Sequence, residues 1–163
     1  MVTEQVSNLL TPIADYFAAK LAEHGAEPRG ADWNGPESQN LRFQQLCKVI
    51  RVDAPFSIND LGCGYGALLD YLSARYPSFD YLGTDISVPM IEAARSEHWR
   101  CPNAAFHMAA EPHRVADYGI ASGIFNIRLD NSDEAWFRYL CGTLNVLDRT
   151  SRLGFAFNCL TSY

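Results

Sequence analysis

The sequence predicts an α/β protein whose mostly parallel, doubly wound sheet is preceded by N-terminal helices. From about residue 56 onward, short apolar strand patterns alternate with stretches of helical spacing. A glycine-rich run, Asp60-Leu61-Gly62-Cys63-Gly64-Tyr65-Gly66, separates the first predicted strand from the helix after it. An acid, Asp85, follows about 20 residues later. Repeated strand–helix alternation of this kind predicts a parallel sheet covered by helices on both faces.

Residues 1–55 are predicted to form a helical cap region in front of the sheet. Apolar residues recur every three or four positions over 3–24, which indicates a helix. Pro12 lies inside this pattern, so it predicts either two short helices or one kinked helix. A turn-rich stretch over 25–36 separates it from a second helix, whose apolar positions run from Leu41 to Ile50. We expect this cap region and residues 56–163 to belong to one structural domain.

Five strands and three helices are expected beyond residue 55. The strands are predicted over 56–60, 80–85, 105–108, 118–125 and 153–159. The helices are predicted over 67–75, 88–99 and 132–147. Pro77 stops the first of these helices, and Ser87 is a candidate N-cap for the second. The carboxyl ends of parallel strands share one edge of a sheet, where a functional site is expected.

Composition narrows the function classes. The 163 residues carry a formal net charge of −6 with scattered basic residues, which disfavours nucleic-acid binding and favours a small-molecule substrate. The five cysteines lie far apart, so neither a disulfide framework nor a zinc site is expected, and we predict no metal. We see no signal peptide and no stretch long enough to span a bilayer. We therefore expect a cytoplasmic protein without membrane contact.

Asp60, the acid at the start of the glycine run, distinguishes between two kinds of nucleotide-binding site. A dinucleotide turn places a pyrophosphate at the helix N-terminus, and a neighbouring carboxylate would repel it. Asp60 stands at that place. A carboxylate there favours a ligand with an ammonium or sulfonium group. A nucleoside that carries positive charge is therefore expected, and an NAD-type oxidoreductase is disfavoured.

These residues resemble a known family. The run from Asp60 to Gly66 is similar to the first motif of the class I (Rossmann-like) S-adenosylmethionine-dependent methyltransferases. Tyr81-Leu82-Gly83-Thr84-Asp85-Ile86-Ser87 and the helix after it resemble the second motif, and 117–123 resemble the strand that leads to the acceptor. The resemblance runs in order from about residue 56 to residue 160. It implies that residues 56–163 bind S-adenosylmethionine as cofactor.

The resemblance also implies roles for single residues. Gly62, Gly64 and Gly66 would let the backbone approach the methionine part and the ribose, with Cys63 in the same cofactor site. Asp60 would hold the amino group, directly or through water. Asp85 would accept hydrogen bonds from both ribose hydroxyls. Ile86 would pack on the adenine, although a simple core role remains an alternative.

After the third predicted strand the sequence departs from the family. Members often have an acid there that binds the adenine amino group, whereas this chain has Ala109 and Ala110. Glu111 is the candidate substitute; a backbone carbonyl in that role, or Glu111 as a solvated loop acid, are the alternatives.

The methyl acceptor is poorly specified by the sequence. Phe125 and Asn126, at the end of the fourth strand, are candidates for its site, but neither is a general base, and the catalytic residues stay unknown. Trp33, Gln39 and Arg42 are candidates for a lid or substrate contact, with Gln39 and Arg42 one helical turn apart. The alternative is a structural role, with Trp33 as a core anchor.

The chain ends soon after its fifth strand. The family usually adds two further strands, so the resemblance implies a sheet without its last two strands. An unpaired edge strand with aromatic side chains predicts either a truncated chain or a homodimer through this strand. A binding-only or inactive cofactor domain is the alternative to a methyltransferase.

Overall fold

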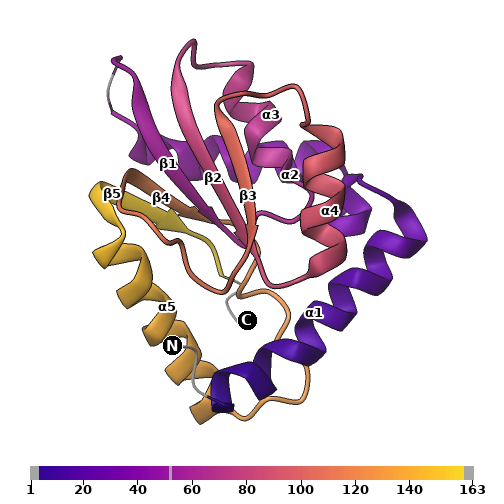
Figure 1. The fold of residues 1–163 in the computed structure, drawn as a ribbon. Coiled ribbons are helices and arrows are strands. Elements are labelled where there is room, and N and C mark those ends of the chain that lie inside the picture. Colours follow the sequence, from indigo (N-terminus) through magenta and orange to yellow (C-terminus); the bar gives the residue numbers. More distant parts are fainter. Residues whose placement is uncertain (1–3, 52, 160–163) are drawn as a thin grey trace.

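The computed structural model describes residues 4–51 and 53–159. Its centre is a five-stranded sheet in the order β3-β2-β1-β4-β5, and every neighbouring pair is parallel (Figure 1). The strands are β1 (Phe56–Leu61), β2 (Phe79–Asp85), β3 (Ala104–Met108), β4 (Ala116–Ala121) and β5 (Ser151–Phe157). The predicted parallel α/β class is confirmed.

Strand order reverses beside β1, because β1 pairs with β2 on one side and with β4 on the other. Open α/β sheets bind ligands at such a reversal, outside the carboxyl ends of the strands. The glycine run follows β1 directly, and Asp85 is the last residue of β2. Topology therefore brings the two sequence motifs together at one edge.

Helices cover both faces of the sheet, as the doubly wound prediction requires. On one face, α2 (Pro36–Leu46), α3 (Ala67–Ser73) and α4 (Val88–Glu97) contribute to a core that includes Ile58, Leu72 and Tyr81. On the other face, α5 (Asp133–Arg149) buries Val146 and Leu147 against β1 and β4. Strand residues such as Ile58 are fully buried because both faces are covered.

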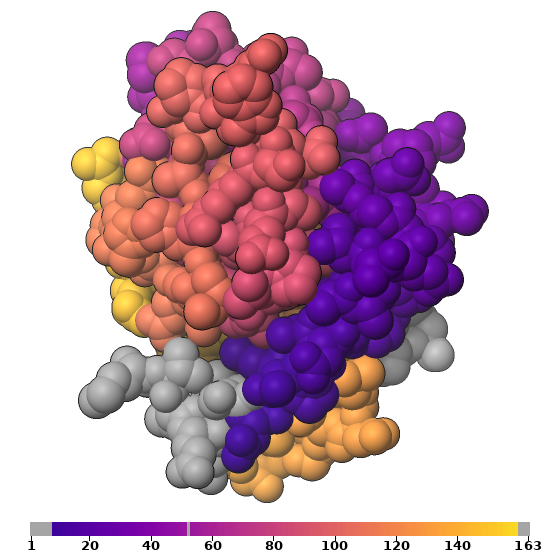
Figure 2. All heavy atoms as spheres, turned by 45° about the vertical axis from the view of Figure 1, so that its right-hand side comes forward, coloured from indigo at the N-terminus to yellow at the C-terminus, as the bar shows by residue number. Residues whose placement is uncertain are grey.

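The first helix, α1 (Glu4–His24), runs past the carboxyl edge of the sheet and reaches α5 (Figure 1). It is a single helix that contains Pro12, so of the two alternatives the one with two short helices is wrong. Its residues Leu9, Leu10 and Ile13 form a cluster with residues that follow β2 and β3 and with residues of α5. A space-filling view shows α1 lying across one side of the molecule (Figure 2).

Several boundaries differ from the predictions. The second helix begins at Pro36, the last residue of the predicted turn-rich stretch, because proline is well suited to the first turn of a helix, and it ends at Leu46 rather than near Ile50. Short 3-10 turns occupy 28–31 and 47–49. β4 ends at Ala121 rather than 125, since Gly123 adopts a positive φ of 84° and the Asn126 N–H donates back to the Gly123 carbonyl. β5 begins at Ser151 and ends at Phe157, two residues earlier than predicted at each end.

None of the helices in the described part of the chain has both the length and the apolar character needed to cross a membrane.

Candidate cofactor site

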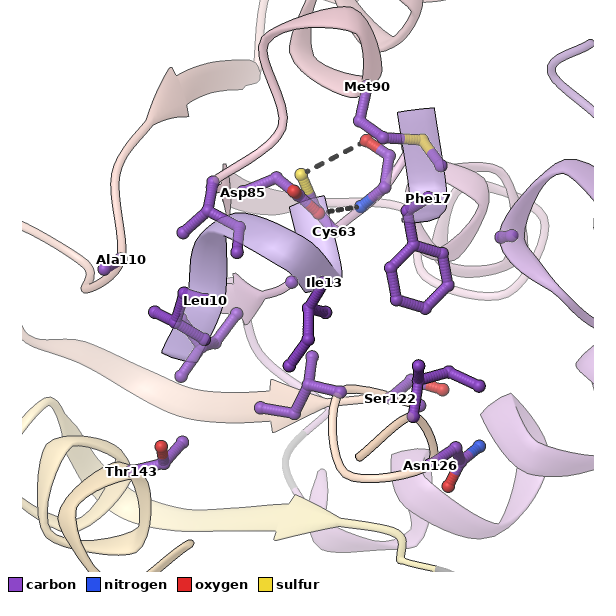
Figure 3. A pocket seen from close by; sticks show the side chains of 18 of the residues that line it. Leu10, Ile13, Phe17, Cys63, Asp85, Met90, Ala110, Ser122, Asn126 and Thr143 are labelled. Atoms are coloured by element: carbon purple, nitrogen blue, oxygen red, sulfur yellow. Dashed lines mark hydrogen bonds between the residues drawn. The ribbon is translucent and has the colours of Figure 1, made fainter. Parts of the chain in front are cut away.

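A cavity of about 670 Å³ lies at the carboxyl edge of the sheet. Its walls come from the segments after β1, β2, β3 and β4 and from one face each of α1 and α5. In Figure 3, Cys63 and Asp85 lie on one side of this space and Ser122, Asn126 and Thr143 on another, with Leu10, Ile13 and Phe17 of α1 between them. A volume of this size is typical of pockets for small molecules and cofactors.

The glycine turn is shaped for close backbone approach. Gly62 and Gly64 have φ values of 75° and 54°, which side chains rarely tolerate, and both line the cavity. The Gly62 N–H donates to the Thr84 carbonyl at 2.8 Å, which ties the turn to β2. A Cβ on Gly62 would lie 2.1 Å from the Ile124 side chain, whereas one on Gly64 would meet only Met90 Sδ, at 3.8 Å. A Cβ on Gly64 would therefore meet no clash within the chain.

Gly66 has a different role from the one the resemblance implies. It does not line the cavity. A Cβ there would lie 2.8 Å from the His98 ring and 3.1 Å from Phe106, and its φ is 89°. The third glycine of the run thus allows α3 to pack closely on α4 and β3, which the sequence spacing alone did not distinguish from ligand contact.

Asp85 is held with its carboxylate in the cavity wall. Its Oδ2 accepts a hydrogen bond from the Gly64 N–H and its Oδ1 accepts one from the Ser87 N–H, both at 2.9 Å. Burial raises the pKa of this carboxyl, and the backbone N–H groups of Ser87, Gly64 and Ile86 oppose the rise. Each carboxylate oxygen keeps a lone pair for a further donor. Asp85 can thus receive two hydroxyl groups.

Asp60 lies at the end of β1 and also lines the cavity. Burial raises the pKa of its carboxyl to about 7, partly offset by a hydrogen bond that Tyr81 Oη donates to Oδ2 at 2.6 Å. The negative charge of Asp85 contributes to the rise. A ligand cation beside Asp60 would favour its charged form. Tyr81, whose ring belongs to the core, holds the Asp60 carboxylate by this hydrogen bond. No pattern in the sequence indicated this contact.

Cys63 and Ile86 both line the cavity. Cys63 is buried, and burial raises the pKa of its thiol well above the usual range, so it is a small packing residue and no nucleophile. Ile86 is half-buried and packs against the α1 cluster of Leu9, Leu10 and Ile13. The position fits both roles considered for Ile86, since a core residue can also form part of the wall.

Glu111 reaches the cavity wall, but its carboxylate forms an ion pair with Arg149 at the end of α5. The side chain of Glu111 is 39% exposed and that of Arg149 is 56% exposed, so the pair lies in solvent and both interpretations of Glu111 stay open. The sequence could not reveal the pair, since the two residues are 38 positions apart.

The acceptor candidates separate in the structure. Asn126 lines the cavity. Phe125 does not: it is buried with its ring edge-on to Tyr139 and Phe157, so the expectation of a substrate contact is wrong for this residue.

The lid candidates separate in the same way. Trp33 and Gln39 line the cavity, and Gln39 is bound to the Tyr65 hydroxyl. Arg42 is exposed and does not line it, so Gln39 and Arg42 do not face the cleft together. The buried residues of α2 are Gln39, Phe43 and Leu46, which lie on one face of the helix, and Arg42 is not among them.

Two cavity walls were missed by the sequence analysis. Leu10, Ile13 and Phe17 of α1 line the cavity, although their spacing indicated only a helix. On α5 the lining residues recur at helical spacing. They are Ala135, Arg138, Tyr139, Gly142, Thr143 and Val146. Apolar periodicity reports that a helix face is covered, and it does not report whether protein or ligand covers it.

The parallel sheet, the glycine turn at its reversal point and the two acids in the cavity wall, Asp60 and Asp85, are the features of a nucleoside-cofactor-binding α/β protein. Residues 59–126 match the family described as "Methyltransferase domain". A Mycobacterium tuberculosis protein named "Putative methyltransferase Rv1506c" is 53% identical over 116 residues, which are 71% of this chain and 70% of that protein. The chain belongs to the class I, Rossmann-like S-adenosylmethionine-dependent methyltransferases.

More distant relatives include a trans-aconitate 2-methyltransferase of Methylobacterium radiotolerans, 33% identical over 104 residues. That match covers 58% of this chain and only 39% of the relative. Among solved structures, the "DhpI-SAM-HEP complex" superposes with a TM-score of 0.65 at 15% identity, over 100% of this chain and 70% of that one. A methyltransferase of Geobacter sulfurreducens in complex with S-adenosyl-L-homocysteine superposes with a TM-score of 0.58 at 18% identity, over 91% of this chain and 55% of that one. Both structures support the fold.

Proposed function

We propose that this cavity holds S-adenosylmethionine and that the protein transfers its methyl group to a small-molecule acceptor. The observation that carries the proposal is the pair of carboxylates, the buried Asp60 and the partly buried Asp85, that flank one glycine turn in one cavity. The comparisons do not favour a binding-only domain, because the relatives are named methyltransferases.

The residues present fit this cofactor. Gly64 lines the cavity at the turn, where a backbone cradle for the ligand is needed. Asp85 keeps one lone pair on each oxygen for the two ribose hydroxyls. Asp60 would receive the ammonium group, and Ile86 would pack on the adenine, with Glu111 near its amino group. The ion pair of Glu111 with Arg149 leaves one of its oxygens for such a contact.

The main contribution of the protein to methyl transfer would be to align the cofactor with the acceptor. S-adenosylmethionine supplies a methyl group already activated on a sulfonium, so no covalent enzyme intermediate is required. The glycine turn and the two acids would fix the orientation of the cofactor. The α1 side chains Leu10, Ile13 and Phe17 would exclude water from the other side of the cavity. Asn126, Gln39 and Trp33 would position the acceptor.

A small-molecule acceptor is supported by the cavity and by the charge. The site lies beneath α1 rather than on an open surface, and the formal net charge of −6 disfavours nucleic acid. The five cysteines are free thiols, which supports a cytoplasmic location.

Calorimetric titration tests the cofactor assignment. S-adenosylhomocysteine should bind and NADH should not. Asp85→Ala should weaken S-adenosylhomocysteine by roughly 1–3 kcal/mol, because the hydroxyls would lose buried partners. Unchanged affinity in this variant would refute the ribose role of Asp85. Release of S-adenosylhomocysteine during incubation with candidate acceptors then measures methyl transfer itself.

A further inference from the structure

Two polar side chains in the cavity wall carry oxygens without a hydrogen-bond partner. Ser122 Oγ and Asn126 Oδ1 are buried, and neither is bonded to another group within the described residues 4–51 and 53–159. Both residues line the cavity, across from Asp85 (Figure 3). Buried polar atoms in folded proteins almost always have a partner, so each exception needs a structural or functional reason. Ser122 and Asn126 are therefore candidates for ligand contact.

The loop that carries this pair has a well-supported backbone. It begins where β4 ends, and the Gly123 N–H in it donates to Asn158 Oδ1 at 2.8 Å. The Asn126 N–H donates to the Gly123 carbonyl at 3.0 Å, which closes a tight turn. Trp33 of the cap region packs on this turn, since a Cβ on Gly123 would lie 3.1 Å from its ring. Rotation about χ1 of Ser122 or χ2 of Asn126 can redirect each oxygen without moving this backbone.

The loop lies on the opposite side of the glycine turn from Asp85. β1, which leads into the turn, pairs with β2 on one side and with β4 on the other. Asp85 ends β2, whereas Ser122 follows β4 directly. The Ile124 side chain adjoins the turn itself, since a Cβ on Gly62 would lie 2.1 Å from it. A cofactor with its ribose at Asp85 and its ammonium at Asp60 would therefore direct its methionine part, which carries the methyl group, toward this loop.

We infer that Ser122 and Asn126 bind the reacting atom of the methyl acceptor, and that this atom is a nitrogen or an oxygen that carries a hydrogen. The inference rests on the proposed function, since it assumes that the cofactor lies between Asp85 and this loop. An N–H or O–H group of the acceptor would donate to Asn126 Oδ1 or Ser122 Oγ and satisfy these buried oxygens. Residues 122–127 contain no ionisable side chain, so the loop offers hydrogen bonds and no charge.

These hydrogen bonds would leave a lone pair of the acceptor atom free to attack the methyl carbon. The lone pair forms the new bond to this carbon while the bond from the carbon to sulfur breaks, and sulfur keeps the electron pair of the broken bond. The hydrogen of the acceptor atom leaves as a proton to water. Ser122 and Asn126 would thus orient the acceptor atom toward the methyl group, which is the alignment that methyl transfer requires.

Probes of similar size test the inference: phenol carries an O–H, aniline carries an N–H, and toluene carries neither. Nuclear magnetic resonance on protein saturated with S-adenosylhomocysteine reports binding through the backbone amide signals of Gly123 and Asn126. Phenol or aniline should shift these signals, and the tighter of the two identifies the acceptor element. Toluene should bind at least about fivefold more weakly. Ser122→Ala and Asn126→Leu should each weaken the tighter probe about fivefold, while S-adenosylhomocysteine affinity stays within about twofold.

Melting temperatures separate ligand contact from a structural role. Asn126→Leu removes a buried oxygen that has no partner, so it should lower the melting temperature by less than about 2 °C. Asn59→Leu is the matched comparison, because the buried Asn59 amide donates to the carbonyls of Arg114 and Thr150. It should lower the melting temperature by at least about 4 °C. Asn145→Leu, at an exposed position outside the cavity, should bind the probes like the wild type.

Four outcomes would overturn the inference while leaving the cofactor assignment intact. They are toluene binding as tightly as phenol and aniline, no signal shift with either phenol or aniline, unchanged probe affinity in both cavity variants, and a melting temperature of Asn126→Leu that falls as far as that of Asn59→Leu. Absence of S-adenosylhomocysteine binding to the wild type would instead remove the proposed function and this inference with it.

Discussion

At the scale of single residues, the raised pKa of Asp60 makes the folding stability of the protein depend on pH. Its folded-state pKa of about 7 lies above the ordinary value of 3.8, so the folded state retains a proton that the unfolded state loses. The resulting stability is complete below pH 4 and is lost as the pH rises through 7. Tyr81 moderates the effect, because its hydroxyl donates to the charged carboxylate.

We predict that Asp60 destabilises the cofactor-free protein by roughly 2 kcal/mol on going from pH 5.5 to pH 8. Urea unfolding at both pH values measures this, and Asp60→Asn should lose that share of the pH dependence. S-adenosylhomocysteine should bind more tightly as the pH rises over the same range, because a charged Asp60 favours an ammonium. Affinity that is flat with pH in the wild type would contradict the proposed contact.

Substitutions of two glycines of the same turn should have different effects, one on stability and the other on ligand binding. Gly66→Ala should destabilise the fold by roughly 2–4 kcal/mol, since its Cβ would overlap the His98 ring at a positive φ. Gly64→Ala should cost only about 1 kcal/mol of stability, because its Cβ would meet only Met90 Sδ at 3.8 Å, but it should weaken S-adenosylhomocysteine about tenfold or more, because Gly64 lines the cavity proposed to hold the ligand. Denaturant unfolding and calorimetry separate the two effects. Normal binding by Gly64→Ala would contradict its place beside the ligand.

At the scale of elements, one side-chain pair joins α2 to the glycine turn. Gln39 and Tyr65 exchange hydrogen bonds at 3.2 and 3.3 Å, and both side chains are buried. α2 also buries Phe43 and Leu46 in the core beside α3. The cap region is therefore attached to the cofactor loop by a specific polar contact as well as by apolar packing.

We predict that Tyr65→Phe destabilises the protein by about 1–2 kcal/mol, because it leaves the Gln39 amide buried and unpaired. The double variant Gln39→Leu with Tyr65→Phe should cost less than the sum of the two single variants, since it removes both polar groups. Denaturant unfolding of the four proteins completes the cycle. Strict additivity would show that the two side chains do not interact.

At the scale of the whole molecule, β5 forms an open edge in the described residues 4–51 and 53–159, where it pairs with β4 alone. Leu153 on this strand is 59% exposed, while Phe155 and Phe157 are half-buried. Unpaired edges with exposed apolar side chains invite pairing with another chain.

We therefore propose that two copies associate through β5. Light scattering with size-exclusion chromatography should give a mass that approaches twice the 18.2 kDa of the monomer as concentration rises. Leu153→Lys should shift the equilibrium toward monomer, because a charge would be buried at the contact. A monomer at every concentration that still binds S-adenosylhomocysteine tightly would refute the dimer.

The sequence by itself determined the features that depend on local patterns of residues. The alternation of strands and helices fixed the fold class, and the spacing of Asp60, the glycines and Asp85 placed the cofactor loop. Only the tertiary structure decided what each side chain meets. In the tertiary structure Gly66 and Phe125 pack against core residues, Glu111 pairs with Arg149, and one face each of α1 and α5 lines the cavity. Those contacts join residues far apart in the chain, so they depend on how the elements pack rather than on any short-range pattern.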